Sequence, residues 1–178
     1  NNGEGSALLK SPDLIEEIVR KVSSAISKPV TVKVRIGFEN APVDIVEIAK
    51  RVEDAGAAAI AVHGRTRQQY YSGTADWDTI RRVKEAVTIP IIGNGDVDSP
   101  LKAEALIKQT GCDAVMVGRA VRGNPWLFRE LNHYFRTGEL MERPSTEEIR
   151  EMILRHARKQ IELKGEFVGI REMRKHVA

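Results

Sequence analysis

The stretch TIPIIGNGDVDSPLKAEALIKQTGCDAVMVGRA, residues 88–120, carries the pattern that decides the fold. It begins and ends with segments that are apolar throughout, as in strands buried on both faces. Between them, apolar residues recur at helical spacing. Ser99-Pro100 marks the start of this helix and Thr110-Gly111 marks its end. The stretch therefore predicts two parallel strands joined by a right-handed helical crossover.

The same alternation of helix and strand occurs earlier in the chain. Further strand segments are PVTVKVRIG, residues 29–37, and AAAIAVHG, residues 57–64, and each follows a stretch with helical periodicity. Four such units predict an α/β protein with a parallel sheet. They suit either half of an eight-stranded (β/α)8 barrel, the TIM barrel, or a small open sheet.

After Ala120 the strand pattern stops and only helices are expected. The apolar spacing predicts an amphipathic helix over 123–135, a linker over 138–145 and a long helix over 145–164. A last helix is expected to start near Val168. The tail is therefore predicted to be a helical hairpin.

The predicted organisation is a barrel-like part over 1–137, the linker over 138–145 and a helical part over 146–178. Residues 143–178 hold nine Lys or Arg and six Asp or Glu, whereas the other 142 residues hold 19 of each sign. A basic tail on a neutral body indicates a polyanionic partner. The alternative is an ordinary solvated face of mixed charge.

The composition places limits on the class of protein. The 178 residues are 42% hydrophobic and 30% charged, which is typical of a soluble globular chain with one domain and a small second one. No apolar run approaches the ~20 residues that a membrane-spanning helix needs. The single cysteine, Cys112, excludes an internal disulfide and any multi-cysteine metal site, and it favours a reducing, cytoplasmic location. The histidines show no metal-ligand spacing, so we expect no metal.

Polar side chains are dense where the second strand segment ends, in HGRTRQQYYSGTADW, residues 63–77. His63, Arg65 and Arg67 stand there beside two tyrosines. The carboxyl ends of parallel strands are where α/β proteins build their sites, and these residue types suit an anionic, planar ligand. A solvated loop is the alternative interpretation.

The third and fourth strand segments end in GNGD, residues 93–96, and VGRA, residues 117–120. In a β/α barrel such loops commonly bind phosphate through backbone N–H groups, and Arg119 would add a charged fork. Glycine is also common in tight β/α turns without any ligand. Together the two loops predict a phosphate-bearing ligand.

Lys33 and Arg35 alternate within the strand VKVRI, so both side chains are expected on one face. Two cations on a buried strand need an anion, a ligand or solvent, and an internal salt bridge is the alternative. Cys112 precedes its strand and is expected to pack at the end of the sheet away from the site. Asp76 and Asp96 are interpreted as orienting or capping groups.

Taken together, VTVKVRIG, HGRTRQQYYSGTADW, IPIIGNGD, VMVGRAVRGNPW and IREMRKH resemble the tRNA-dihydrouridine synthase family, especially its bacterial DusB-like branch. The resemblance covers nearly the whole chain. It implies a TIM barrel that binds FMN, followed by a helical domain that binds tRNA. It also implies reduction of the 5,6 double bond of uridine in tRNA, with NADPH as the reductant.

The resemblance assigns roles to particular residues. Lys33 would contact the flavin ring, and Arg35 would face the target uracil. The other expected contacts are His63 in the FMN site, Asn94, Gly95, Asp96, Gly118 and Arg119 at the ribityl phosphate, Arg65 and Arg67 on RNA or uracil, and Arg171, Arg174 and Lys175 on tRNA phosphates.

One family feature has no counterpart in this sequence. The family's general acid is a cysteine in a loop after the fourth barrel strand, and its pattern places Asn1 to Gly5 just beyond that loop. The chain is therefore expected to be the C-terminal half of the barrel with an incomplete helical domain, inactive alone and prone to self-association through exposed strand edges.

Two other functions are compatible with parts of the pattern. A flavin barrel of the dihydroorotate dehydrogenase type would explain the phosphate loops and Lys33, but not the basic tail. A non-catalytic RNA-binding module would explain the tail, with the barrel as a scaffold only.

Overall fold

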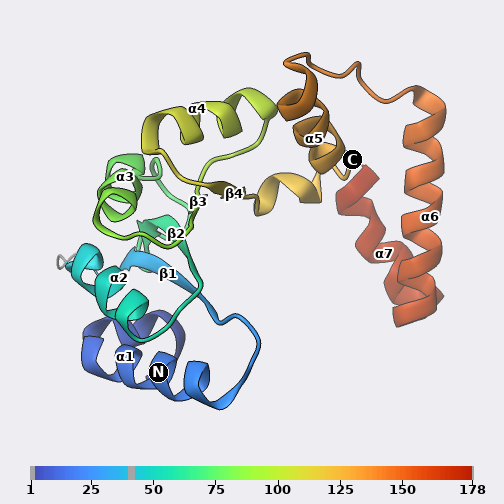
Figure 1. The fold of residues 1–178 in the computed structure, drawn as a ribbon. Helices are drawn as coiled ribbons and strands as arrows, with labels where there is room; N and C mark the ends of the chain where they lie inside the picture. Colours follow the sequence, from blue (N-terminus) through green and yellow to red (C-terminus); the bar gives the residue numbers. More distant parts are fainter. Residues whose placement is uncertain (1–2, 40–42, 178) are drawn as a thin grey trace. The chain divides into compact units, whose positions relative to one another are not determined.

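The structure is a computed structural model that describes residues 3–39 and 43–177 (Figure 1). The chain divides into two compact units, Asn1–Gly118 and Arg119–Ala178. The first unit contains the sheet, and the second is helical. The prediction that the barrel-like domain ends at residue 137 stays a prediction.

The first unit is built on a four-stranded parallel sheet. Its strands lie in the order β1-β2-β3-β4, so each strand pairs with its neighbour in the sequence. The strands are β1 (Thr31–Gly37), β2 (Ala59–Thr66), β3 (Ile91–Asn94) and β4 (Ala114–Met116). This order is the one expected for part of a (β/α)8 barrel, and the predicted α/β fold class is confirmed.

Helices connect the strands and lie along one side of the sheet (Figure 1). Their apolar faces are buried against it, with Val52, Ile80 and Leu106 fully enclosed. A short 3-10 helix, η1, precedes the first of them. The elements are η1 (Gly5–Lys10), α1 (Pro12–Ala25), α2 (Ile45–Asp54), α3 (Trp77–Ala86) and α4 (Pro100–Thr110).

The helix signals in the sequence correspond to caps in the structure. The Ser99 side chain accepts a hydrogen bond from the Lys102 N–H, and α4 ends at Gly111 with a φ of 67°. Asp76 caps α3 by accepting from the Thr79 N–H at 2.9 Å, which confirms its predicted capping role. These caps fix where each helix starts, and hence the length of the loops between strands and helices.

β2 is longer at its carboxyl end than the sequence predicts. The strand continues through His63 to Thr66, because its pairing with β1 resumes at Gly37 opposite Thr66 after an irregularity. The irregularity lies between Arg35 and Gly37. His63, Gly64 and Arg65 are therefore strand residues, with β1 partners on either side of the irregularity at His63 and Thr66, and the connecting loop begins after Thr66.

The second unit consists of helices. They are η2 (Arg119–Arg122), α5 (Leu127–Thr137), α6 (Thr146–Lys164) and α7 (Glu166–Val177). Ser145 and Glu148 form a capping box at the start of α6. Gly165, with a φ of 76°, interrupts the helical conformation between α6 and α7. Gly169 lets the two helices approach closely, since a Cβ there would lie 2.9 Å from the Gln160 backbone.

Two helix starts differ from the predictions. α5 begins at Leu127 rather than at Gly123, because Asn124 forms a turn in which its side chain accepts from the Trp126 N–H. α7 begins at Glu166, directly after the Gly165 break, rather than near Val168. The predicted long helix ending at Lys164 is confirmed.

None of the helices in residues 3–39 and 43–177 is both long and apolar enough to cross a membrane. β1 and β4 are the outer strands of the four-stranded sheet. The self-association expected from such edges stays a prediction.

Candidate functional site

Three predicted site residues and Met116 form a row across the carboxyl end of the sheet. Arg35 pairs with His63, His63 pairs with Asn94, and Asn94 pairs with Met116. Lys33 lies two residues before Arg35 on β1 and pairs with Ala61. Parallel pairing thus places predicted site residues from β1, β2 and β3 at one edge of the sheet, as expected for a site of this fold.

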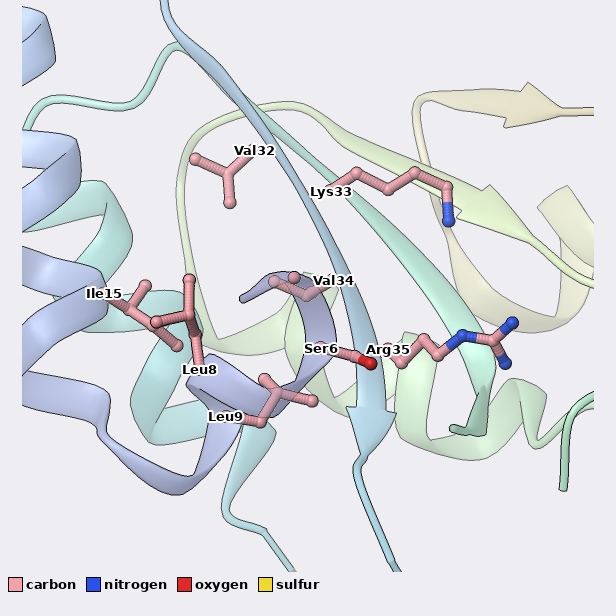
Figure 2. Close-up of a pocket in the computed structure, with 9 residues that line it drawn as sticks. Ser6, Leu8, Leu9, Ile15, Val32, Lys33, Val34 and Arg35 are labelled. Carbon is pink, nitrogen blue, oxygen red and sulfur yellow. The ribbon is translucent and has the colours of Figure 1, made fainter. Parts of the chain in front are cut away.

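The Lys33 and Arg35 side chains extend from the same side of β1, away from Leu8 and Ile15 (Figure 2). Both line a cavity of about 330 Å³ between β1 and η1. The shared face predicted from their i, i+2 spacing is confirmed.

The charges of Lys33 and Arg35 are not balanced by the described part of the chain. Within residues 3–39 and 43–177, neither forms an ion pair with a carboxylate, so the alternative of an internal salt bridge is not realised there. Partial burial, and then the charge of Arg35, lowers the pKa of the Lys33 ammonium group. Arg35 donates from Nη1 to the Thr66 carbonyl at 2.9 Å and to the Tyr70 carbonyl at 3.4 Å. An anionic or carbonyl-bearing ligand would relieve this unbalanced positive charge.

His63 is buried beside these cations, with 7% of its surface exposed. Burial, followed by the charges of Arg35 and Lys33, lowers the pKa of its imidazole to about 4. The ring is therefore neutral at neutral pH. A neutral imidazole has one N–H donor and one nitrogen acceptor, so it can orient a polar ligand without adding charge.

Arg65 is the largest fully buried side chain, with 1% exposed. Its two Nη atoms bind the Asp96 carboxylate at 2.8 and 2.9 Å. Nε donates to the Ser72 carbonyl at 3.1 Å, and Nη2 also donates to the Gly73 carbonyl. The resemblance implies that Arg65 contacts RNA or uracil, which stays a prediction; in the structure its guanidinium is enclosed and bound within the protein. The reason is the bidentate match between guanidinium and carboxylate, which satisfies both charges away from solvent.

The GNGD segment folds against the loop that follows β2. Asp96 Oδ2 also accepts from the Ala75 N–H at 2.7 Å, so the carboxylate orients that loop, as predicted for an orienting group. Gly95 has a φ of 139°, and a Cβ on it would lie 2.5 Å from the Ala75 side chain. Trp77 Nε1 donates to the Gly95 carbonyl at 3.1 Å. Only glycine fits this position.

Asn94 ties the ends of β3 and β4 together. Its Nδ2 donates to the Met116 carbonyl at 2.7 Å. Further along, Gly118 is exposed, and a Cβ on it would meet nothing within 4 Å. Arg119 begins η2 in the second unit. The predicted phosphate contacts of these residues stay predictions.

The remaining predicted cations are exposed. Arg67 lies in the loop after β2, with its guanidinium carbon 5.8 Å from the centre of the Phe38 ring. Arg171, Arg174 and Lys175 lie on the surface of α7, and Arg171 stacks over Phe167 at 4.2 Å. All four are accessible to a polyanion, and their role as RNA contacts stays a prediction.

Sequence reasoning did not identify the Arg65–Asp96 pair. The two residues are 31 positions apart, and no local pattern links them. Cys112 is buried, as expected for a packing residue, and its Sγ lies 2.9 Å from where a Gly93 Cβ would be; its separation from the site stays a prediction. In the described part of the chain, His, Cys, Asp and Glu form no group of three that could hold a metal ion.

Residues 1–178 match the dihydrouridine synthase family. The tRNA-dihydrouridine synthase B of Shewanella oneidensis is 46% identical over 173 residues, which are 97% of this chain and 54% of that protein. Those of Pseudomonas putida and Proteus vulgaris are 45% identical over 177 residues and 47% identical over 174 residues, covering 99% and 98% of this chain and 52% and 54% of the relatives. The chain thus spans about half the length of these relatives.

Proposed function

This chain belongs to the dihydrouridine synthase family, and we propose that it takes part in the FMN-dependent reduction of uridine to 5,6-dihydrouridine in tRNA. The relatives named tRNA-dihydrouridine synthase B support the reaction and the tRNA substrate. NADPH is the proposed reductant. The observation that carries the proposal within the structure is the pair of cations on β1, which have no carboxylate partner among residues 3–39 and 43–177.

The residues of the sheet edge fit FMN. FMN combines a phosphate with a planar ring whose edge carries carbonyl groups, and it supplies hydride-transfer chemistry when bound. Lys33 and His63 are proposed to hold the ring, while Asn94, Gly95, Asp96, Gly118 and Arg119 are proposed to hold the phosphate arm. Because the Asp96 carboxylate is bound to Arg65, Asp96 would serve through its backbone and by fixing the loop.

Lys33 has the clearest chemical role. Its ammonium group has no carboxylate to neutralise it in the described chain, and its lowered pKa reflects the cost of that charge. A bound group that gains negative charge would be stabilised by Nζ in this partly dry setting. Lys33 would thus hold a proton and a positive charge at the ring edge.

Arg35 and His63 would orient the reacting partners. Arg35 uses Nη1 on the carbonyls of Thr66, at the end of β2, and of Tyr70, in the following loop, which fixes the guanidinium plane and leaves other N–H groups for a uracil carbonyl. His63 would add one hydrogen bond without charge. The target base must leave its stack to reach such a site.

A titration with FMN, followed by quenching of flavin fluorescence, tests the cofactor assignment. We expect Lys33→Ala to weaken FMN binding by roughly 10- to 100-fold, the range for losing one hydrogen bond from a charged group. Lys28→Ala is the matched control, because Lys28 is exposed and precedes the same strand at its other end. Equal dissociation constants for the two variants would remove the basis for this site.

A further inference from the structure

Tyr70 has a backbone conformation that side chains avoid. Its φ is 52°, and in the described chain only Tyr70 and Asp96 among non-glycine residues have a positive φ. Asp tolerates this region because its short side chain bonds locally, whereas a bulky aromatic residue is a genuine outlier there. Tyr70 is also 66% exposed, so burial of its ring does little to offset the strain.

The surrounding loop holds Tyr70 in this conformation from both sides. Its N–H donates to the Arg67 carbonyl at 3.2 Å, and its carbonyl accepts from Arg35. Gln69 and Thr66 exchange two hydrogen bonds just before it. Arg65 binds the Ser72 carbonyl just after it. Strain that the fold maintains at an exposed position points to a use for the side chain.

The position of the ring is also fixed. The Tyr70 and Tyr71 rings meet edge to face, with centroids 4.4 Å apart and planes at 65°. Tyr70 thus offers an aromatic face to solvent on a backbone with little freedom. Such a face loses little conformational entropy when a flat ligand stacks on it.

The loop and its neighbours on the first unit carry an excess of positive charge. Lys33, Arg35 and Arg67 contribute three charges, and Lys10 lies 4.5 Å from the centre of the Phe38 ring that Arg67 also faces. Of the neighbouring carboxylates, Glu39 is paired with Lys10 and Asp96 is bound to Arg65. Aromatic faces flanked by cations are the usual surface for unpaired bases and their phosphates.

We propose that Tyr70 is a stacking platform for an unpaired RNA base, with Arg67 at the adjacent phosphate. This rests on the proposed function, since it takes single-stranded RNA as the partner. Arg35, the proposed uracil contact, binds the Tyr70 carbonyl and does not use the Tyr70 ring. The ring is therefore left for a different base, and we assign it to one that neighbours the reacting uridine. The fold keeps an aromatic residue where glycine would be less strained, and stacking explains why.

The test compares three variants of the whole chain. Tyr70→Asn keeps a residue that tolerates positive φ but removes the aromatic face. Tyr70→Phe keeps the face and removes only the hydroxyl. Tyr70→Gly relieves the strain. Binding to unmodified tRNA and to a short uridine-rich single-stranded RNA is measured for each, together with the urea unfolding midpoint.

We expect Tyr70→Asn and Tyr70→Gly to bind RNA roughly 10-fold or more weakly, as for loss of one base stack, while Tyr70→Phe stays within about twofold of the parent. The unfolding midpoint of Tyr70→Gly should not fall. Leu101→Asn, at an exposed apolar position on α4, should leave RNA affinity unchanged. Unchanged RNA affinity of Tyr70→Asn, or equal losses in Tyr70→Asn and Tyr70→Phe, would overturn the proposal.

FMN titration of the same proteins separates this proposal from the proposed function. If the parent chain binds FMN and RNA but Tyr70→Asn binds RNA normally, only the stacking role is wrong. If the parent chain binds RNA through Tyr70 but does not bind FMN, the stacking role stands and the flavin reaction fails. If the parent chain binds no RNA, the stacking role is overturned as well.

Discussion

The cations at the sheet edge and those on α7 have opposite environments. Arg65 is enclosed, and Arg35 binds two backbone carbonyls, so both guanidinium groups have defined positions. Arg174 and Lys175 are exposed on a helix surface and belong to a mixed-charge segment. Fixed, partly dry cations specify the geometry of a ligand, whereas exposed ones mainly attract polyanions and are screened by salt.

The same contrast applies to ion pairs. The Arg65–Asp96 pair has an Arg side chain that is 1% exposed, whereas Lys164 and Glu172, which link α6 and α7, are 45% and 34% exposed. An exposed pair adds little to stability, because water already solvates both charges. A buried charge that loses its partner has no such alternative.

The largest expected effect comes from breaking the buried pair. Asp96→Ala should lower the free energy of unfolding by about 3 to 5 kcal/mol, because it leaves the Arg65 guanidinium buried without a counter-charge. Urea denaturation measures this loss. Glu172→Ala is the control on the exposed side and should leave the unfolding midpoint unchanged. Similar midpoints for the two variants would show that the buried pair contributes no more to the free energy of unfolding than the exposed pair does.

A second, smaller effect should appear as pH dependence. The pKa of His63 is lowered from 6.5 to about 4, so the unfolded chain takes up a proton in this window and the folded chain does not. Stability from the neutral ring is therefore complete above pH 6.5 and is lost as the pH falls towards 4, by at most about 3 kcal/mol. Comparing denaturation of the parent chain and His63→Gln across this range isolates the contribution. Parallel curves for the two proteins would contradict it.

The smallest effect concerns the exposed cations of α7. The double variant Arg174→Ala, Lys175→Ala should weaken tRNA binding at low salt and reduce the slope of log affinity against log salt by about 1 to 2, without changing FMN binding. Filter binding over a salt series measures the slope. An unchanged slope would mean that α7 does not bind phosphates, and the helical region would then need another partner.

Much of the fold was predictable because its signals are local. The strand–helix–strand period, the Ser99 cap and the Gly111 stop follow from residues that are close in sequence, and the structure confirms them. The shared face of Lys33 and Arg35 follows from the two-residue alternation of side chains along a strand. The boundaries of β2 and α5 were less accurate, because they depend on pairing across the sheet and on a side-chain turn.

The candidate site was only partly predictable. Residue types at strand ends indicated where Lys33, His63 and Asn94 lie, since parallel strands place their carboxyl ends at one edge. They did not indicate that Arg65 turns inwards while Arg67, two residues later, stays exposed. That difference depends on Asp96, which only the folded chain brings beside Arg65.

The sequence by itself determined the α/β alternation, the helix caps, the family and the set of polar residues at the strand ends, because each depends on short-range spacing or on similarity along the chain. Only the tertiary structure decided which of those residues are free to bind a ligand. Burial, the lowered pKa of His63, the Arg65–Asp96 pair and the strained Tyr70 all arise from groups that are distant in sequence. Their energies depend on how far water is excluded, which is a property of the packed molecule rather than of any one segment.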